Sequence, residues 1–302
     1  MFQRMMVLLD SIKFAHSIFA LPFALLAMIV AANGWPSGKI SALIIFCMIT
    51  ARSAAMTFNR LVDRHFDAAN PRTHRRPTVT GAISAPFLIG FILICCVLFW
   101  VSSMLLNHLC GLLALPLLAV LLGYSLSKRF TNLSHFWLGL ALGLAPLAAH
   151  LAVRGNFEPL PGLALRWPIS VELFPFLLGL TVFFWVSGFD LIYSCQDYEV
   201  DRADSRLHSL PKTIGVRNAL IVSAILHFFS GLLFFATGAY AGMGLLYYVA
   251  VFISCGLLVY EHWIVRPADL SRVNVAFFTL NGLVSLLLFA AVFVERVLFG
   301  KT

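Results

Sequence analysis

The sequence predicts an all-α, polytopic membrane helix bundle, and three observations carry that prediction. Hydrophobic side chains make up 61% of the 302 residues and charged side chains only 11%, and the mean hydropathy is +0.92. Apolar runs of about 20 residues, the length of a helix that crosses a bilayer, follow one another along the chain. Lys and Arg gather in alternate loops between these runs. Because the runs use nearly all of the length, we predict a single transmembrane domain over residues 1–302 and no separate soluble domain.

Nine transmembrane helices are predicted, each from an apolar run bounded by Gly, Pro, Asn or a charged residue. The first run is too long for the core of a signal peptide and has no clear cleavage site, so we expect it to be the first span. The predicted ranges are 12–32, 40–60, 86–106, 109–127, 133–153, 171–196, 217–238, 242–264 and 273–297.

The distribution of basic residues predicts the orientation of these helices. With the N-terminus in the cytoplasm, the cytoplasmic segments hold 16 of the 21 Lys and Arg residues, and this count includes Arg52 and Arg60 at the second helix. Cytoplasmic loops normally carry such an excess, so we expect a cytoplasmic N-terminus and a C-terminus on the other side. The net charge of +8 is then explained by topology, and we expect no binding of nucleic acid.

Acidic residues are concentrated in two short windows, which hold seven of the 13 in the chain. The first follows the second predicted helix and has the spacing NxxxDxxxD, with Asn59, Asp63 and Asp67. Helical residues four apart share a face, so this window predicts a stripe of oxygen ligands at a helix end. Ionisable groups close to the membrane are costly and usually mark a functional site.

The second window follows the sixth predicted helix and repeats this arrangement. Asp190, Asp197 and Asp201 lie at offsets of seven and four, so we expect them on one helix face as well. Two such stripes can hold Mg²⁺, which accepts one or two carboxylates and completes its shell with water and phosphate oxygens. We therefore expect the ligand to be a phosphate ester, specifically a diphosphate bridged by metal.

Basic residues follow each acidic stripe and also lie in the loop between them. Arg gives bidentate contacts to phosphate and Lys a point charge, so these residues are candidates for neutralising a diphosphate. They are Arg72, Arg75, Arg76, Lys128, Arg129, Arg206 and Lys212. The alternative is that the stripes are solvated helix ends, with Asp63 and Asp67 paired to Arg60 and Arg64.

Both windows resemble the UbiA superfamily of intramembrane aromatic prenyltransferases, whose signature is NDxxDxxxD followed far downstream by DxxxD. The stretch FNRLVDRHFDAANPRTHRRPTVTGAIS is similar to the first family loop, YSLSKRFTN to a YxxxKRxT segment between spans, and FDLIYSCQDYEVDRADSRLHSLPKTIG to the second loop. The opening IKFAHSIFALPFALLA resembles the first helix of relatives that act on hydroxybenzoate or dihydroxynaphthoate. The resemblance covers essentially the whole chain and is strongest to the hydroxybenzoate branch.

This resemblance implies roles for individual residues. Lys128 and Arg72 would contact the diphosphate as catalytic residues, and Asp190 matches the acidic residue seven before the second motif in the hydroxybenzoate branch. Arg60 stands where many members have the second residue, Asp, of NDxxD, and His208 where several have Lys. The residues that would bind Mg²⁺ and diphosphate are Asn59, Asp63, Asp67, Asp197 and Asp201.

The chemistry expected of such a site begins when an allylic diphosphate ionises, because metal and cationic side chains stabilise its leaving group. An electron-rich aromatic ring then captures the carbocation. We expect Asp190 to orient the acceptor hydroxyl or take the proton, and Tyr124 and Tyr193 to face the cation, with ordinary packing of both tyrosines as the alternative. Lys13, His16 and Lys212 are further candidates for substrate binding, and an ordinary core histidine is the alternative for His16.

The leading hypothesis is an Mg²⁺-dependent enzyme of quinone biosynthesis that joins a polyprenyl diphosphate to an aromatic acid. 4-Hydroxybenzoate and 1,4-dihydroxy-6-naphthoate remain open as acceptors, as do the ubiquinone and menaquinone pathways. We expect it in the bacterial inner membrane, with its site facing the cytoplasm and no obligate protein partner. A secondary transporter is the competing class, although its charged residues would lie near the bilayer midplane on interrupted helices. A phosphatidyl-transfer enzyme is less favoured because its Gly and Ala-Arg motif residues are absent.

Overall fold

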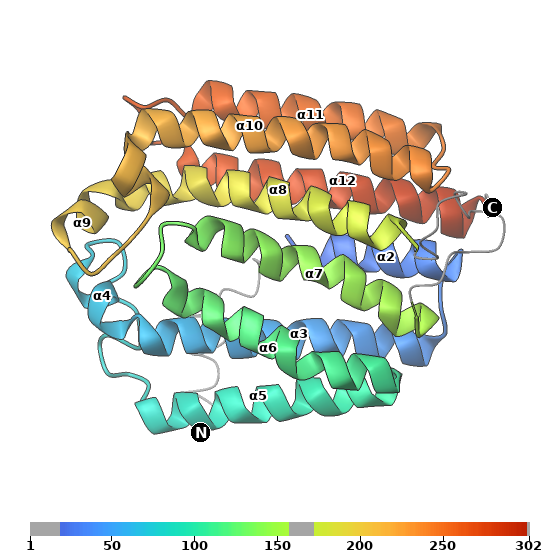
Figure 1. The fold of residues 1–302 in the computed structure, drawn as a ribbon, viewed down its shortest axis with the longest axis horizontal. Coiled ribbons are helices and arrows are strands. Elements are labelled where there is room, and N and C mark those ends of the chain that lie inside the picture. Colours follow the sequence, from blue (N-terminus) through green and yellow to red (C-terminus); the bar gives the residue numbers. More distant parts are fainter. Residues whose placement is uncertain (1–18, 157–171, 301–302) are drawn as a thin grey trace.

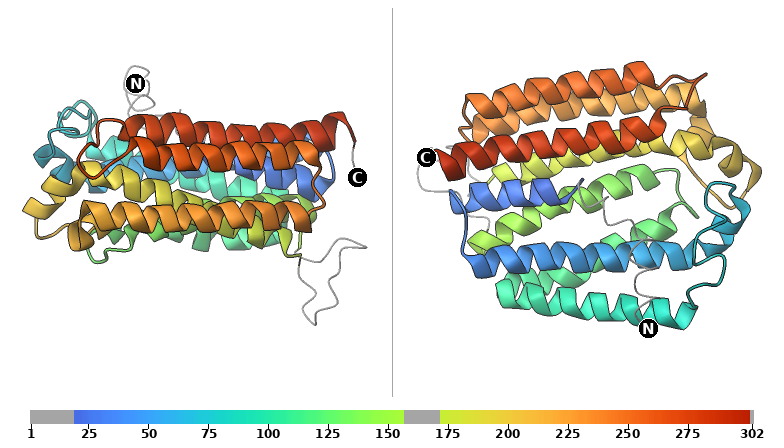
Figure 2. Two further views of the ribbon diagram at one scale, coloured as in Figure 1. Left: turned by 90° about the horizontal axis from the view of Figure 1, so that it is seen from above. Right: turned by 180° about the vertical axis from the view of Figure 1, so that it is seen from behind.

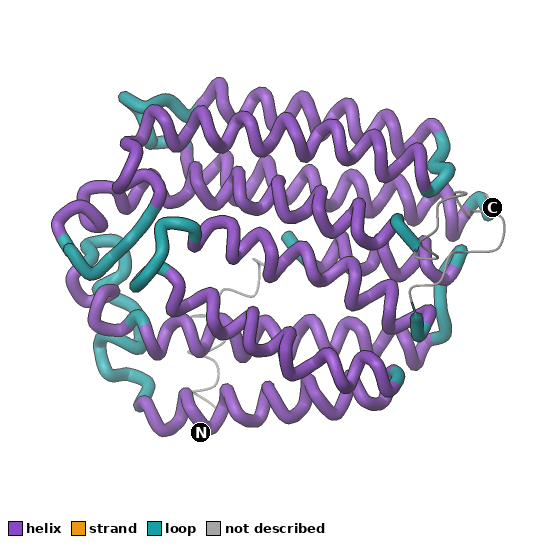
Figure 3. The backbone as a smooth tube through the Cα atoms, in the orientation of Figure 1, coloured by secondary structure: helices purple, strands orange, loops and turns teal. Residues whose placement is uncertain are grey.

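Long, nearly parallel helices form the part of the chain that the computed structural model describes, residues 19–156 and 172–300 (Figure 1). Figure 3 shows helices and loops but no strand within these residues. Two short helices, α4 (Arg64–Ala69) and α9 (Tyr198–Ala203), lie at one end of the bundle. The longer helices are α2 (Leu21–Ala32), α3 (Gly38–Val62), α5 (Ala85–Leu106), α6 (His108–Ser127), α7 (Ser134–Arg154), α8 (Phe174–Ser194), α10 (Leu210–Tyr240), α11 (Leu245–Ile264) and α12 (Asn281–Phe293). The predicted all-α class is confirmed.

Within the described residues, eight helical segments are long and apolar enough to cross a membrane. The last of them, Val275–Leu298, joins α12 to a π-helical turn on either side. The first predicted helix, 12–32, begins before the described residues, and its described part, α2, has 12 residues. The count of nine helices and the orientation of the N-terminus therefore stay predictions.

The boundaries of the helices follow the signals in the sequence. Ser37 accepts a hydrogen bond from the backbone N–H of Ile40 and begins α3. Asn107 does the same for Cys110 at the start of α6, at 2.8 Å. The largest difference from prediction is in α10, which begins before the predicted 217–238. Ser209 caps an additional first turn, and Gly215, with a φ of 81°, interrupts the helix before the span proper begins.

The order in space places α8 at the centre of the bundle. It packs against α7 on one side and α10 on the other, while α2 packs against α7 and α12. Figure 2 shows the same neighbours from behind. α7 and α8 approach closely because glycines face each other, and a methyl group added at Gly143 would come 2.6 Å from the carbonyl oxygen of Gly179. Small residues allow such contact between membrane helices.

Apolar and polar side chains are divided between the surface and the interior as in a membrane protein. Leu93, Phe252 and Val259 are 60%, 68% and 71% exposed on the outer faces of α5 and α11. In the interior, Trp185 donates a 2.7 Å hydrogen bond to Asn281, which donates to Glu261 at 3.0 Å. Apolar side chains outside and paired polar groups inside suit a helix bundle surrounded by lipid. The chain is thus a multi-pass integral membrane protein.

Candidate active site

The two acidic windows meet at one end of the bundle, where α4 and α9 lie (Figure 1). Asn70, in the loop after α4, donates a 2.9 Å hydrogen bond to Asp197. The guanidinium of Arg72 reaches the same carboxylate at 2.5 and 3.3 Å and donates to the hydroxyl of Tyr193 at 2.7 Å. The loop after the first window is therefore bound directly to the second window.

Asp63 lies at the centre of the first window. Its Oδ2 accepts hydrogen bonds from Lys128 at 2.6 Å and from Asn59 at 2.9 Å, and its Oδ1 is buried with no hydrogen-bond partner among the described residues. Burial raises the pKa of the Asp63 carboxyl, and the ammonium of Lys128 acts against that rise. The structure thus brings Lys128, from a separate segment, onto the Asn59 and Asp63 pair of the first window.

Asp67 binds residues of the loop that follows it. Both of its carboxylate oxygens accept from Arg76 at 2.6 Å, and its backbone carbonyl accepts from the Thr73 hydroxyl at 3.0 Å. The described residues contain no ion pair between Asp63 or Asp67 and Arg60 or Arg64, so the pairing expected for merely solvated helix ends is wrong.

Neither stripe lies on one straight helix, and this corrects the predicted geometry. α3 ends at Val62, Asp63 is its cap with φ −86° and ψ −1°, and Asp67 belongs to α4. In the second window Asp190 lies in α8, Asp197 in a 3₁₀ turn and Asp201 in α9. The 3₁₀ turn has fewer residues per turn than an α-helix, so the offsets from Asp190 to Asp197 and Asp201 do not follow one α-helical period.

Two predicted binding residues are held by the second loop itself. The ammonium of Lys212 donates to the backbone carbonyls of Asp204 and Leu207 at 2.8 and 2.6 Å. Arg206 pairs with Asp204 at 2.7 Å, which holds the pKa of that exposed carboxyl down at about 2. Lys13 and His16 lie outside the described residues.

Arg60 is a buried cation in the middle of this end of the bundle. It is 6% exposed, its Nη1 lies 3.5 Å from Asn59 Oδ1, and its Nε has no partner among the described residues. Arg72, Arg76 and Lys128 each have a carboxylate partner instead. Arg60 therefore has hydrogen-bonding capacity left for an anion.

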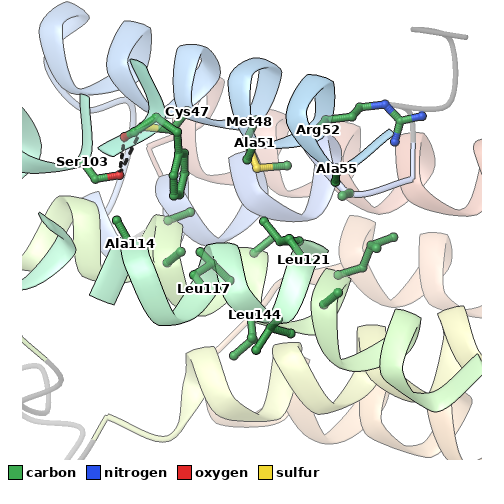
Figure 4. A pocket seen from close by; sticks show the side chains of 18 of the residues that line it. Cys47, Met48, Ala51, Arg52, Ala55, Ser103, Ala114, Leu117, Leu121 and Leu144 are labelled. Carbon is green, nitrogen blue, oxygen red and sulfur yellow. Dashed lines mark hydrogen bonds between the residues drawn. The ribbon is translucent and has the colours of Figure 1, made fainter. Parts of the chain in front are cut away.

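A cavity of about 670 Å³ opens next to these residues, between α3, α5, α6 and α7. Its walls are almost entirely apolar, with Leu117, Leu121 and Leu144 among the lining residues (Figure 4). Asn59 and Tyr124 line its polar end. Arg52 also lines the cavity, and in Figure 4 the guanidinium of Arg52 lies to the right of Ala55. Arg52 and Arg60, which the sequence assigned to a cytoplasmic segment, lie within α3.

Asp190 has a partner that sequence reasoning missed. His135, at the start of α7, places its Nδ1 2.7 Å from Asp190 Oδ2. It is one of nine histidines, and nothing in its spacing separates it from the others. Tyr124 lies within electrostatic reach of Asp190 and Asp63, so these three side chains border the same region.

The available ligands suit Mg²⁺ in their chemistry. Carboxylate oxygens are its preferred protein ligands, and Asp63 has a buried oxygen without a partner in the described part of the chain. Among the residues that the structure describes, no three Asp, Glu, His or Cys side chains converge as a ready metal cluster. The carboxylates are held by Lys128, Arg72 and Arg76 instead, so metal binding would require these cations to shift toward another anion.

Comparison with known proteins agrees with this geometry. The model of the UbiA prenyltransferase family matches residues 20–283. A 4-hydroxybenzoate octaprenyltransferase from Nitrosomonas europaea is 30% identical, over 88% of this chain and 85% of the relative. An enzyme of the same name from Haemophilus ducreyi is 28% identical over 80% and 81%.

Solved structures show the same architecture. The apo structure of a UbiA homolog from Aeropyrum pernix K1 has a TM-score of 0.82 and 30% identity, and covers 94% of this chain and 99% of its own. A UbiA homolog from Archaeoglobus fulgidus bound to DMAPP and Mg²⁺ has a TM-score of 0.73 at 19% identity, with 95% and 97% covered. The resemblance seen in the two acidic windows is thereby confirmed, and the chain belongs to the UbiA prenyltransferase family.

Proposed function

We propose that the protein transfers a polyprenyl group from polyprenyl diphosphate to an aromatic acid of the 4-hydroxybenzoate type and releases diphosphate, with Mg²⁺ as cofactor. One observation carries the proposal: Asn70 and Arg72 join the first acidic window to Asp197 of the second, beside the polar end of an apolar cavity. The names of the relatives support the acceptor, and the homolog bound to DMAPP and Mg²⁺ supports the donor and the metal.

The cations of the site suit a diphosphate leaving group. Lys128 and Arg72 pair with carboxylates of the two windows, and Arg60 is buried next to Asn59 without a carboxylate partner in the described structure. Preorganised positive groups in a water-poor site stabilise the negative charge that develops on a leaving diphosphate. Bound Mg²⁺, held by Asn59, Asp63, Asp67, Asp197 and Asp201, would add Lewis-acid stabilisation of the same charge.

The apolar cavity suits the hydrocarbon chain of the donor. It begins at Asn59 and Tyr124, next to the acidic end, and continues between leucines and alanines of α3, α6 and α7. Apolar walls favour a polyprenyl tail and exclude water from the carbocation. In this arrangement the diphosphate lies among the loops and the tail lies at membrane depth.

The acceptor ring would lie between Asp190 and the reacting carbon of the donor. Asp190 is the acidic residue of α8. Its side chain is 13% exposed and is bound to His135, not to a cationic residue of the loops. It would orient the acceptor hydroxyl or take the proton, while Tyr124 and Tyr193 present aromatic faces to the cation. Lys13 and His16 remain candidate contacts.

The biological setting follows from the acceptor. We propose a role in quinone biosynthesis in the bacterial inner membrane, with the acidic end facing the cytoplasm. The relatives favour a ubiquinone pathway, and 1,4-dihydroxy-6-naphthoate in a menaquinone pathway is the alternative acceptor. No protein partner is required by this proposal.

The test is prenyl transfer by the purified full-length protein with Mg²⁺, labelled polyprenyl diphosphate and a panel of aromatic acids. We expect a prenylated product and released diphosphate with 4-hydroxybenzoate, and loss of both when Mg²⁺ is chelated. Product only with 1,4-dihydroxy-6-naphthoate would assign the menaquinone alternative. Failure to release diphosphate with every acceptor would overturn the enzyme proposal, and substrate flux across vesicles would then indicate a transporter.

A further inference from the structure

The pair formed by His135 and Asp190 joins the start of α7 to the end of α8. The two side chains are 5% and 13% exposed, and the distance from Nδ1 to Oδ2 is 2.7 Å. Because a carboxylate accepts, the imidazole must donate through Nδ1–H, and in the neutral ring this leaves the lone pair on Nε2. Nε2 is buried and has no partner among the described residues.

This hydrogen bond fixes the orientation of the Asp190 carboxylate. One oxygen is held by His135, and Asp190 has no second hydrogen-bonding partner within the described part of the chain. An aspartate near the end of a helix can rotate about its side-chain bonds, and a buried donor on a neighbouring helix restricts that rotation. The second carboxylate oxygen is thereby left free and held in one direction.

The pair adjoins residues that line the cavity. His135 shares a face of α7 with Leu138 and Leu142, three and seven residues later, and both of these line the cavity. Tyr124, which lines the cavity from α6, is within electrostatic reach of Asp190. A molecule in the polar end of the cavity would therefore lie close to the free oxygen of Asp190.

We propose that His135 is a positioning residue that holds Asp190 as the proton acceptor of the reaction, an inference that rests on the proposed function. The bond from the allylic carbon to oxygen breaks, and its electron pair leaves with the diphosphate. Ring electrons form the new carbon–carbon bond, and the proton on the same ring carbon then passes to Asp190 as its bonding pair returns to the ring. His135 supplies the hydrogen bond and does not take the proton.

Two substitutions at His135 distinguish a role in positioning Asp190 from a role in packing alone. His135→Gln keeps a side-chain N–H that can reach Asp190, whereas His135→Leu keeps a buried side chain without a donor. We expect kcat to fall roughly 100-fold in His135→Leu, the lower range for loss of acid–base catalysis. In His135→Gln we expect kcat within about fivefold of wild type, because the donated hydrogen bond is retained. His108→Leu, at the exposed start of α6, is the matched control.

An isotope effect provides a readout that a structural role would not change. With an acceptor deuterated at the ring positions that are prenylated, we expect a primary isotope effect on kcat in His135→Leu, because proton removal becomes rate-limiting. The wild type, His135→Gln and His108→Leu should show none. The KM for the polyprenyl diphosphate should stay within about twofold in all four proteins, because donor binding is left intact.

The outcomes separate this inference from the function on which it rests. A wild-type protein without prenylated product would overturn both. An active wild type with a His135→Leu variant of normal kcat, or of low kcat without an isotope effect, would overturn the positioning role alone. Equal loss and equal isotope effects in His135→Leu and His135→Gln would show that the imidazole itself takes the proton, which also contradicts the proposal.

Discussion

The guanidinium of Arg72 and the carboxylate of Asp197 join two loops that are 125 residues apart in sequence, with Nη2 and Oδ2 separated by 2.5 Å. The side chains are 35% and 22% exposed, so the pair is open to ligands from the loop side. Arg72 also binds the hydroxyl of Tyr193, whose ring lies 4.2 Å from that of Phe277. The second acidic window is therefore completed by a residue of the loop that follows the first.

Neutralising Asp197 should weaken the binding of Mg²⁺ at this site. We expect Asp197→Asn to lower kcat roughly 100-fold, as loss of an electrostatic group does in other enzymes. The Mg²⁺ concentration for half-maximal activity should rise, since an amide is a poorer ligand for a hard cation. Glu199→Gln is the matched control, because Glu199 lies two residues away and is exposed. Equal Mg²⁺ titrations for the two variants would contradict the metal role of Asp197.

Removing the charge of Arg60 should raise the KM for the polyprenyl diphosphate donor and leave the KM for the aromatic acceptor nearly unchanged. Arg60 is 6% exposed and has no carboxylate partner in the described residues, so it is available to bind the diphosphate of the proposed donor. We expect Arg60→Gln to raise the KM for polyprenyl diphosphate roughly tenfold, the scale of one charge-assisted hydrogen bond. The KM for the aromatic acid should change less than twofold, and Arg64→Gln, on the exposed side of α4, should behave as wild type. An unchanged donor KM would show that Arg60 is only a structural cation.

The architecture was largely predictable from the sequence because its signal is repeated in every span. Runs of apolar residues ending at Ser, Asn, Gly or charge give helix ranges within a few residues of the structure, as for 86–106 and Ala85–Leu106. The exception at α10 is also physical. The turn before Gly215 contains Pro211, Lys212 and Thr213, so it does not extend the apolar run, although Ser209 caps it.

The site was predictable in composition but not in geometry. The spacing of Asn59 and Asp63 gave a true side-chain contact, because both lie at the end of one helix. Offsets across the helix ends at Asp63 and Asp197 carry less information, since periodicity assumes a helix that continues. The contact of His135 with Asp190 spans 55 residues and depends on how α7 packs on α8, which a single sequence does not show.

Narrowing the cavity should discriminate between donors of different length. Leu117 and Leu115 are two residues apart on α6, but Leu117 lines the cavity whereas Leu115 is 60% exposed on the outer face. We expect Leu117→Phe to lower kcat/KM for a long polyprenyl diphosphate roughly tenfold, about 1.4 kcal/mol. A two-isoprene donor should react as before, because its tail ends before the constriction. Leu115→Phe should leave both donors unchanged, and an equal loss with both donors in Leu117→Phe would argue that the tail lies elsewhere.

Separating α7 from α8 should destabilise the whole site, because the two helices carry His135 and Asp190. A methyl group at Gly143 would come 2.6 Å from the carbonyl oxygen of Gly179, so any larger side chain must push the helices apart. We expect Gly143→Val to lower the free energy of unfolding by about 1–3 kcal/mol, the usual cost of overpacking. Gly90→Val on α5 is the matched control, because no atom lies within 4 Å of the added methyl position. Thermal unfolding in detergent measures both variants, and equal midpoints would show that α7 and α8 tolerate separation. If only Gly143→Val unfolds early, the close approach of Gly143 and Gly179 is what stabilises the packing of α7 on α8, the two helices that carry His135 and Asp190.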